Sequence, residues 1–122
     1  MEWMSFIASD LHKGGFMPLF KATTPPVYRE VARTYVNRHL AWLNRELADR
    51  DYLTGAAFTI ADAHCYTIVM WTRALDVETS AWPHLEAYLA RVGARPSVKA
   101  AEQAAREQGE RERAARVRAR LG

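Results

Sequence analysis

The sequence predicts an all-α protein, a helical bundle of about five helices around one buried central helix over residues 59–75. Apolar residues recur at intervals of three and four along most of the 122 residues, and few segments alternate apolar and polar residues as strands do. Glycine and proline separate the apolar stretches from one another. With 49% hydrophobic and 25% charged residues, the composition is that of a folded domain and excludes a disordered polymer.

The first predicted helix begins near Glu2 and ends near Phe20. Gly14, Gly15 and Pro18 lie inside it. We expect these three residues to loosen or kink the helix, because glycine disfavours helix and proline lacks a backbone donor.

A long second helix is expected after Thr24-Pro25-Pro26, since threonine can cap a helix and proline in the first turn loses no internal hydrogen bond. Its apolar residues are spaced by four and three, so they share one face that needs a partner in the core. These residues are Tyr28, Ala32, Val36, Leu40, Leu43 and Leu47.

The predicted central helix begins after a turn formed by residues 51–55. Thr59 and Asp62 have the types and spacing of a capping box, in which each side chain bonds to the backbone N–H of the other residue. This structural role accounts for Asp62, so we do not interpret its carboxylate as a catalytic acid. Between residues 60 and 75 only Asp62 and Arg73 are charged, and a helix that is apolar nearly all round is buried.

A further helix is expected between Pro83 and Gly93, and the domain is expected to span residues 1–100. Residues 101–122 are then a charged helical extension. The net charge of the chain is +3, and residues 102–120 hold six arginines against four glutamates. Three Glu-to-Arg pairs in this extension are spaced i, i+4, which predicts a self-paired, solvated helix. The pairs are Glu102–Arg106, Glu107–Arg111 and Glu112–Arg116.

These charges and the lack of apolar runs limit the expected partners. Because the tail arginines have internal partners, nucleic-acid binding through the tail is kept only as a weaker alternative. No apolar run approaches the roughly 18 residues of a membrane span, so we expect a cytoplasmic protein without membrane contact.

The single cysteine, Cys65, is predicted to be a buried, inert thiol. The four histidines do not have the spacing of metal ligands, so no metal site is expected.

The order of motifs resembles the C-terminal helical domain of glutathione S-transferases, most closely the bacterial beta class. The matching segments are FIASDLHK (6–13), PLF (18–20), DYLTG (51–55), FTIADA (58–63), WPHL (82–85) and RP (95–96). The FTIADA segment with the preceding turn marks the helical domain of the superfamily, and the His12-Lys13 pair is more specific to the beta class. The resemblance covers about residues 1–100.

The resemblance implies a transferase that conjugates the glutathione thiolate to hydrophobic electrophiles, a detoxification reaction carried out by cytoplasmic homodimers. In that family a thioredoxin-like N-terminal domain binds glutathione, and no part of this chain shows its strand and helix pattern. The isolated chain is therefore expected to be inactive. The alternative is a non-catalytic interaction or assembly module of the kind that elongation-factor and synthetase-associated proteins build from similar helical domains.

The resemblance also assigns site residues. It places His12 and Lys13 beside glutathione, where a hydrogen bond or positive charge favours the thiolate; the alternative is that both complement a helix dipole. Four further residues match the wall of the electrophile pocket, with core packing as the alternative. They are Phe16, Phe20, Trp71 and Leu75.

Overall fold

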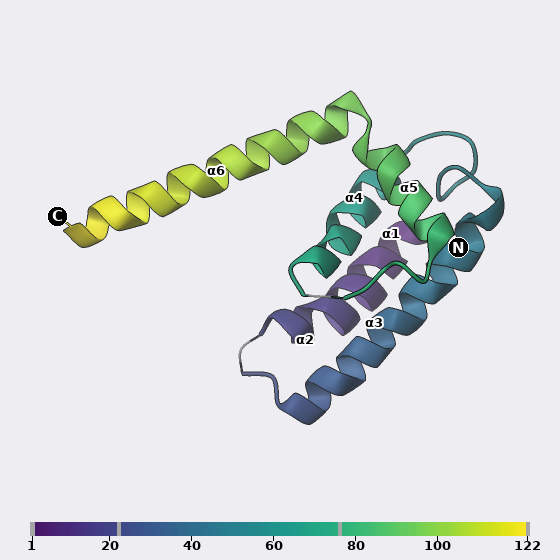
Figure 1. The fold of residues 1–122 in the computed structure, drawn as a ribbon, viewed down its shortest axis with the longest axis horizontal. Helices are drawn as coiled ribbons and strands as arrows, with labels where there is room; N and C mark the ends of the chain where they lie inside the picture. The colour runs from purple at the N-terminus through teal and green to yellow at the C-terminus, as the bar shows by residue number, and fades with distance from the viewer. Residues whose placement is uncertain (1, 22, 76, 122) are drawn as a thin grey trace. The chain divides into compact units, whose positions relative to one another are not determined.

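The computed structural model describes residues 2–21, 23–75 and 77–121, and helices account for most of them. No strand occurs among these residues, which confirms the all-α fold (Figure 1). The helices of the first of two compact units, residues 1–92, are α1 (Trp3–Ser5), the π-helix η1 (Phe6–Phe16), α2 (Met17–Phe20), α3 (Pro26–Glu46), the 3₁₀ turn η2 (Leu47–Asp49), α4 (Ile60–Val69), the 3₁₀ turn η3 (Met70–Arg73) and α5 (Pro83–Gly93). The second unit, residues 93–122, contains α6 (Pro96–Leu121).

The N-terminal helical stretch runs from α1 through η1 to α2 without a break. The loosening expected at the glycines takes the form of π geometry, in which the Met17 N–H donates to the His12 carbonyl five residues back. A Cβ atom on Gly15 would lie 2.9 Å from Cγ2 of Val36, and one on Gly14 would lie 3.3 Å from Cε1 of Tyr35. The two glycines therefore let η1 approach α3 closely.

The predicted apolar face of α3 lies in the core. Ala32, Val36, Leu40 and Leu43 are buried, and so is Leu47 in the following turn. Tyr28, the first residue of the predicted apolar face, is not buried. It lies in the first turn of α3 and is 52% exposed, and the nearby Val27 and Val31 are exposed as well, so the buried face of α3 begins at Ala32.

A buried carboxylate joins three segments of the first unit. Asp62 is 0% exposed. Its Oδ1 accepts hydrogen bonds from the Leu53 N–H (2.9 Å) and the Tyr88 hydroxyl (2.8 Å). Its Oδ2 accepts from the Thr59 N–H (2.9 Å) and the Thr59 hydroxyl (3.3 Å), and the two residues form a capping box at the start of α4. Asp62 thus connects the turn before α4, α4 itself and α5.

The central helix differs in length and burial from the prediction of one buried helix over residues 59–75. The α-helix ends at Val69 and tightens into η3, as the last turns of α-helices often do. One face of α4 is buried, but Ile60 is 76% exposed and Thr67 is exposed as well. An apolar residue in the first turn of a helix can lie outside the packed layer, so composition alone overstated the burial.

None of the described helices combines the length and the apolar character needed to span a bilayer.

Replacing Asp62 with alanine is expected to lower the free energy of unfolding by about 3 kcal/mol, because the buried donors of Leu53 and Tyr88 and the part-buried N–H of Thr59 all lose their acceptor. Tyr88→Phe removes one donor and leaves the carboxylate with its other bonds, so a loss of about 1 kcal/mol is expected. Urea denaturation followed by circular dichroism measures both. A loss for Asp62→Ala no larger than for Tyr88→Phe would show that Asp62 does not organise the unit.

Candidate functional site

Four rings meet at one place in the first unit, around the indole of Trp71. The centroid of the Trp71 ring lies 5.1 Å from that of His12, 6.0 Å from that of Phe16 and 5.3 Å from that of Phe20. All three rings approach it edge to face, the arrangement that aromatic pairs favour. We call His12, Phe16, Phe20 and Trp71 the Trp71 ring cluster.

The local sequence explains how the cluster forms. His12, Phe16 and Phe20 are four residues apart, so the N-terminal helical stretch carries them on neighbouring turns of one face. The π geometry between His12 and Met17 lies inside this interval and contributes to the alignment of the rings. Trp71 comes from η3, where the chain has tightened after the end of α4.

The cluster extends from the core to the surface. Phe16 is 0% exposed and Phe20 is 44% exposed. His12 and Trp71 are partly buried. Phe16 is therefore fixed in the core, whereas the ring of Phe20 exposes apolar surface to solvent. Such a gradient allows a small apolar molecule to contact rings that the fold already holds in place.

The two other residues that the resemblance assigned lie outside these ring contacts. Lys13 is exposed and follows His12, so its side chain leaves the helix in a different direction. Leu75 is partly buried and follows η3, with its N–H donating to the Thr72 carbonyl at 3.2 Å. The structure brings together four of the six assigned residues by direct contact.

A second aromatic cluster lies between the start of the N-terminal stretch and α3. Trp42 contacts Trp3 (centroids 5.6 Å apart) and Phe6 (5.1 Å), and His39 contacts Phe6 (5.4 Å) and Tyr35 (4.3 Å). Sequence reasoning missed this cluster, because it requires pairing two helices whose register the sequence does not give. The available signal was the spacing of aromatic residues by three or four within each helix.

The electrostatics of the second cluster keep its histidine neutral. Burial lowers the pKa of His39, and the charge of Arg38 lowers it further against the opposing effect of Asp10. The Tyr35 hydroxyl donates to Asp10 Oδ1 at 3.3 Å, and burial followed by that carboxylate raises the pKa of Tyr35. Both groups are thus uncharged at neutral pH, which suits packing rather than proton transfer.

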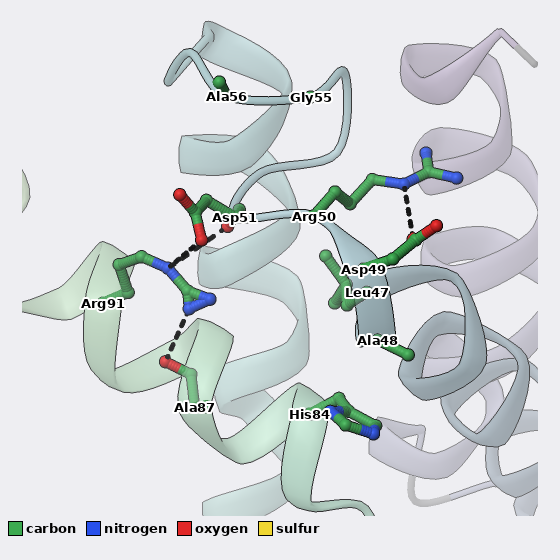
Figure 2. A pocket seen from close by; sticks show the side chains of 10 residues that line it. All are labelled: Leu47, Ala48, Asp49, Arg50, Asp51, Gly55, Ala56, His84, Ala87 and Arg91. Atoms are coloured by element: carbon green, nitrogen blue, oxygen red, sulfur yellow. Dashed lines mark hydrogen bonds and ion pairs between the residues drawn. The ribbon is translucent and has the colours of Figure 1, made fainter.

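An open cavity of about 560 Å³ lies between η2, the turn that follows it and α5 (Figure 2). Arg91 Nε donates to the Asp51 carbonyl at 3.3 Å and lies 3.9 Å from the Asp51 carboxylate, as Figure 2 shows. Arg50 pairs with Glu46 at 2.9 Å and donates to the Leu53 carbonyl at 2.9 Å. Because these charges already have partners, the contacts hold the turn in place and do not favour a ligand of either charge.

The only thiol of the chain is unsuited to chemistry. Cys65 is fully buried, and burial raises its pKa to about 12, although a hydrogen bond with Tyr88 acts in the opposite direction. Burial also raises the pKa of Tyr88, as do the neighbouring Cys65 and Asp62. A thiol that stays protonated at neutral pH is a poor nucleophile. In the described part of the chain, no three potential ligand side chains gather as a metal site would require.

Known proteins share this sequence and this fold. Residues 7–96 match the family model described as "Glutathione S-transferase, C-terminal domain". The chain belongs to the glutathione S-transferase family. The glutathione S-transferase GstA of Escherichia coli O157:H7 is 36% identical over 99 residues, which cover 81% of this chain and 49% of GstA.

Solved transferase structures agree with this assignment. A sphingomonad glutathione S-transferase complexed with glutathione is 38% identical with a TM-score of 0.79, over 84% of this chain and 50% of that one. The beta-class glutathione S-transferase of Sphingomonas chungbukensis is 36% identical with a TM-score of 0.79, over the same shares of the two chains. The chain therefore spans about half the length of these glutathione S-transferases and corresponds to their helical C-terminal domain.

Cys65 is expected to react with a thiol reagent at pH 8 at least about 100-fold more slowly in the folded chain than in denaturant. The raised pKa means that folding favours the neutral thiol, so its contribution to stability is full below pH 9.0, the ordinary value, and is lost as the pH rises toward about 12. Urea denaturation between about pH 8.5 and 9.5 measures this fall, below the ordinary pKa of 10.0 near which Tyr35 and Tyr88 contribute in the same direction. Cys65→Ala is the control and is expected to remove most of the slope; an unchanged slope would contradict the assignment.

Proposed function

We propose that the chain is the electrophile-binding half of a cytoplasmic, homodimeric glutathione S-transferase, with the Trp71 ring cluster as the apolar wall of the electrophile site. The observation that carries the proposal is the convergence of His12, Phe16 and Phe20 on Trp71. The resemblance assigned His12 to the glutathione side and the other three residues to the electrophile pocket, although Trp71 lies far along the chain from the rest. Core packing alone accounts for Phe16, but not for the partly exposed rings of Phe20 and Trp71.

The proposed conjugation reaction requires only an apolar surface from the Trp71 ring cluster. A hydrophobic electrophile needs an apolar surface beside the attacking sulfur, and its affinity comes mainly from the apolar area removed from water. Phe20, Trp71 and Leu75 offer such an area in this proposal, and the buried Phe16 keeps the surface rigid. Because contacts with aromatic rings and aliphatic groups are not directional as hydrogen bonds are, such a site accepts electrophiles of varied shape.

His12 and Lys13 supply the polar side of the proposed site. The contact with Trp71 holds the His12 ring in one orientation, so its free edge can donate a hydrogen bond to the glutathione thiolate or to a glutathione carboxylate. The exposed ammonium group of Lys13 adds positive charge one residue later. Both effects favour the ionised form of the co-substrate, and the ionised sulfur is the nucleophile.

A thioredoxin-like segment is the proposed partner, since glutathione must be held in place while its sulfur attacks. The side chains of the Trp71 ring cluster and Lys13 are too few to enclose a whole tripeptide. The 122-residue chain tested alone is therefore expected to conjugate glutathione no faster than the reaction in buffer, because binding one reactant does not activate the other.

The decisive experiment fuses the N-terminal half of GstA to the chain and measures conjugation of glutathione to 1-chloro-2,4-dinitrobenzene. Trp71→Ala is expected to raise the KM for the electrophile about tenfold, and to change the KM for glutathione less than about twofold, because it removes apolar surface only. His12→Ala is expected to raise the KM for glutathione or lower kcat instead.

Trp82→Ala is the matched control, because it removes an indole outside the Trp71 ring cluster, and it is expected to leave both KM values unchanged. Equal effects of Trp71→Ala and Trp82→Ala would contradict the proposed wall. A folded fusion protein that shows no conjugation would favour the alternative, a non-catalytic interaction module.

A further inference from the structure

The charges of α6 are unevenly distributed along the helix. Residues 99–112 contain three basic and four acidic residues, whereas residues 113–121 contain four arginines and no acidic residue. We call residues 113–121 the basic segment. It lies beyond residue 96, where the match to the transferase family ends, so the family fold does not account for it.

Most arginines of the basic segment have no partner among the residues that the structure describes. The predicted pair between Glu107 and Arg111 is present at 3.8 Å, but it precedes the segment. Arg116 donates to the Glu112 carbonyl at 3.4 Å rather than to its carboxylate. The remaining three have neither an ion pair nor a hydrogen bond within the described residues: Arg113, Arg118 and Arg120. The i, i+4 pairs predicted for the tail do not include these three arginines.

The basic segment also exposes apolar side chains. Val117 is 52% exposed and Leu121 is 82% exposed. At about 100° per residue, these two side chains share one strip of the helix surface. Arg113 and Arg120 border this strip on one side and Arg118 borders it on the other. An apolar strip with arginines on both sides is the pattern of a helix that lies in a membrane interface.

Neither the helix dipole nor a nucleic acid makes use of both the arginines and the apolar strip. Arginines in the last turn complement the dipole, but that effect reaches neither Arg113 nor the strip. The phosphates of a nucleic acid would pair with the arginines, but they would leave Val117 and Leu121 in water. The extension also has no aromatic residue on which a base could stack. Acyl chains and anionic headgroups together use both features.

We propose that the basic segment of α6 binds the surface of an anionic membrane, with Val117 and Leu121 inserted at the headgroup boundary and the flanking arginines bound to lipid phosphates and carboxylates. The lack of a spanning helix led to the expectation of no membrane contact, but a helix that lies on the surface needs no spanning length. The inference is independent of the transferase reaction proposed for the first unit.

Co-sedimentation of the full chain with vesicles tests the proposal. Vesicles of phosphatidylcholine with about one-third phosphatidylserine are expected to bind the chain at about 0.1 M salt, and pure phosphatidylcholine vesicles much less. Arg118→Gln with Arg120→Gln is expected to weaken binding about 25-fold, from about fivefold per charge. Val117→Ser with Leu121→Ser is expected to weaken it about tenfold.

Matched variants separate the basic segment from general charge effects. Arg106→Gln with Arg111→Gln removes the same charge from the same helix, and is expected to weaken binding less than about threefold. Arg118→Lys with Arg120→Lys keeps the charge and is expected to retain binding. Circular dichroism of each variant checks that α6 remains helical.

Three outcomes would overturn the proposal. The first is equal binding of the chain to both kinds of vesicle. The second is a loss of vesicle binding in the Arg106→Gln, Arg111→Gln variant as large as that in the Arg118→Gln, Arg120→Gln variant. The third is salt-sensitive binding to duplex DNA without vesicle binding, unaffected by the serine substitutions, which would assign the segment to nucleic acid.

Discussion

The first unit is organised by one buried carboxylate. Asp62 accepts hydrogen bonds from the turn before α4, from the first residue of the capping box and from Tyr88 in α5. A carboxylate that is 0% exposed is stable only when its lone pairs are satisfied, so these three segments are held together as a set. The start of α4 is thereby fixed, and with it the position of η3 and Trp71 at the other end of the same helical run.

The second constraint is the close approach of η1 to α3 at the paired glycines. The space beside Gly15 is filled by Val36, whose methyl group would lie 2.9 Å from an added Cβ. This contact sets how deeply the N-terminal stretch lies against α3. The rings of His12, Phe16 and Phe20 lie on the same stretch, so their meeting with Trp71 depends on a packing distance set elsewhere in the fold.

The parts of this architecture that depend on local chemistry could be predicted from the sequence. A capping box needs two residue types at one spacing, and a buried helical face needs apolar residues at intervals of three and four, so both can be read along the chain. The bond between Asp62 and Tyr88 joins residues 26 positions apart, and the second aromatic cluster joins two helices. Such contacts depend on the register between helices, which no local pattern encodes. In α6, Arg106 bonds to Gln103 and Arg116 to the Glu112 carbonyl, since solvated side chains choose among several partners of similar energy.

The protonation state of Cys65 determines whether this chain can supply a thiolate nucleophile of its own. Cys65 is buried beside Tyr88 and Asp62, and its pKa is raised to about 12, so at neutral pH the chain presents no thiolate of its own. The Trp71 ring cluster offers apolar contacts and an imidazole, which can orient an electrophile and stabilise a nearby anion but cannot attack. In the proposed reaction the nucleophile is therefore brought by a second molecule, and the role proposed for the helical half is to place the electrophile in reach of that sulfur.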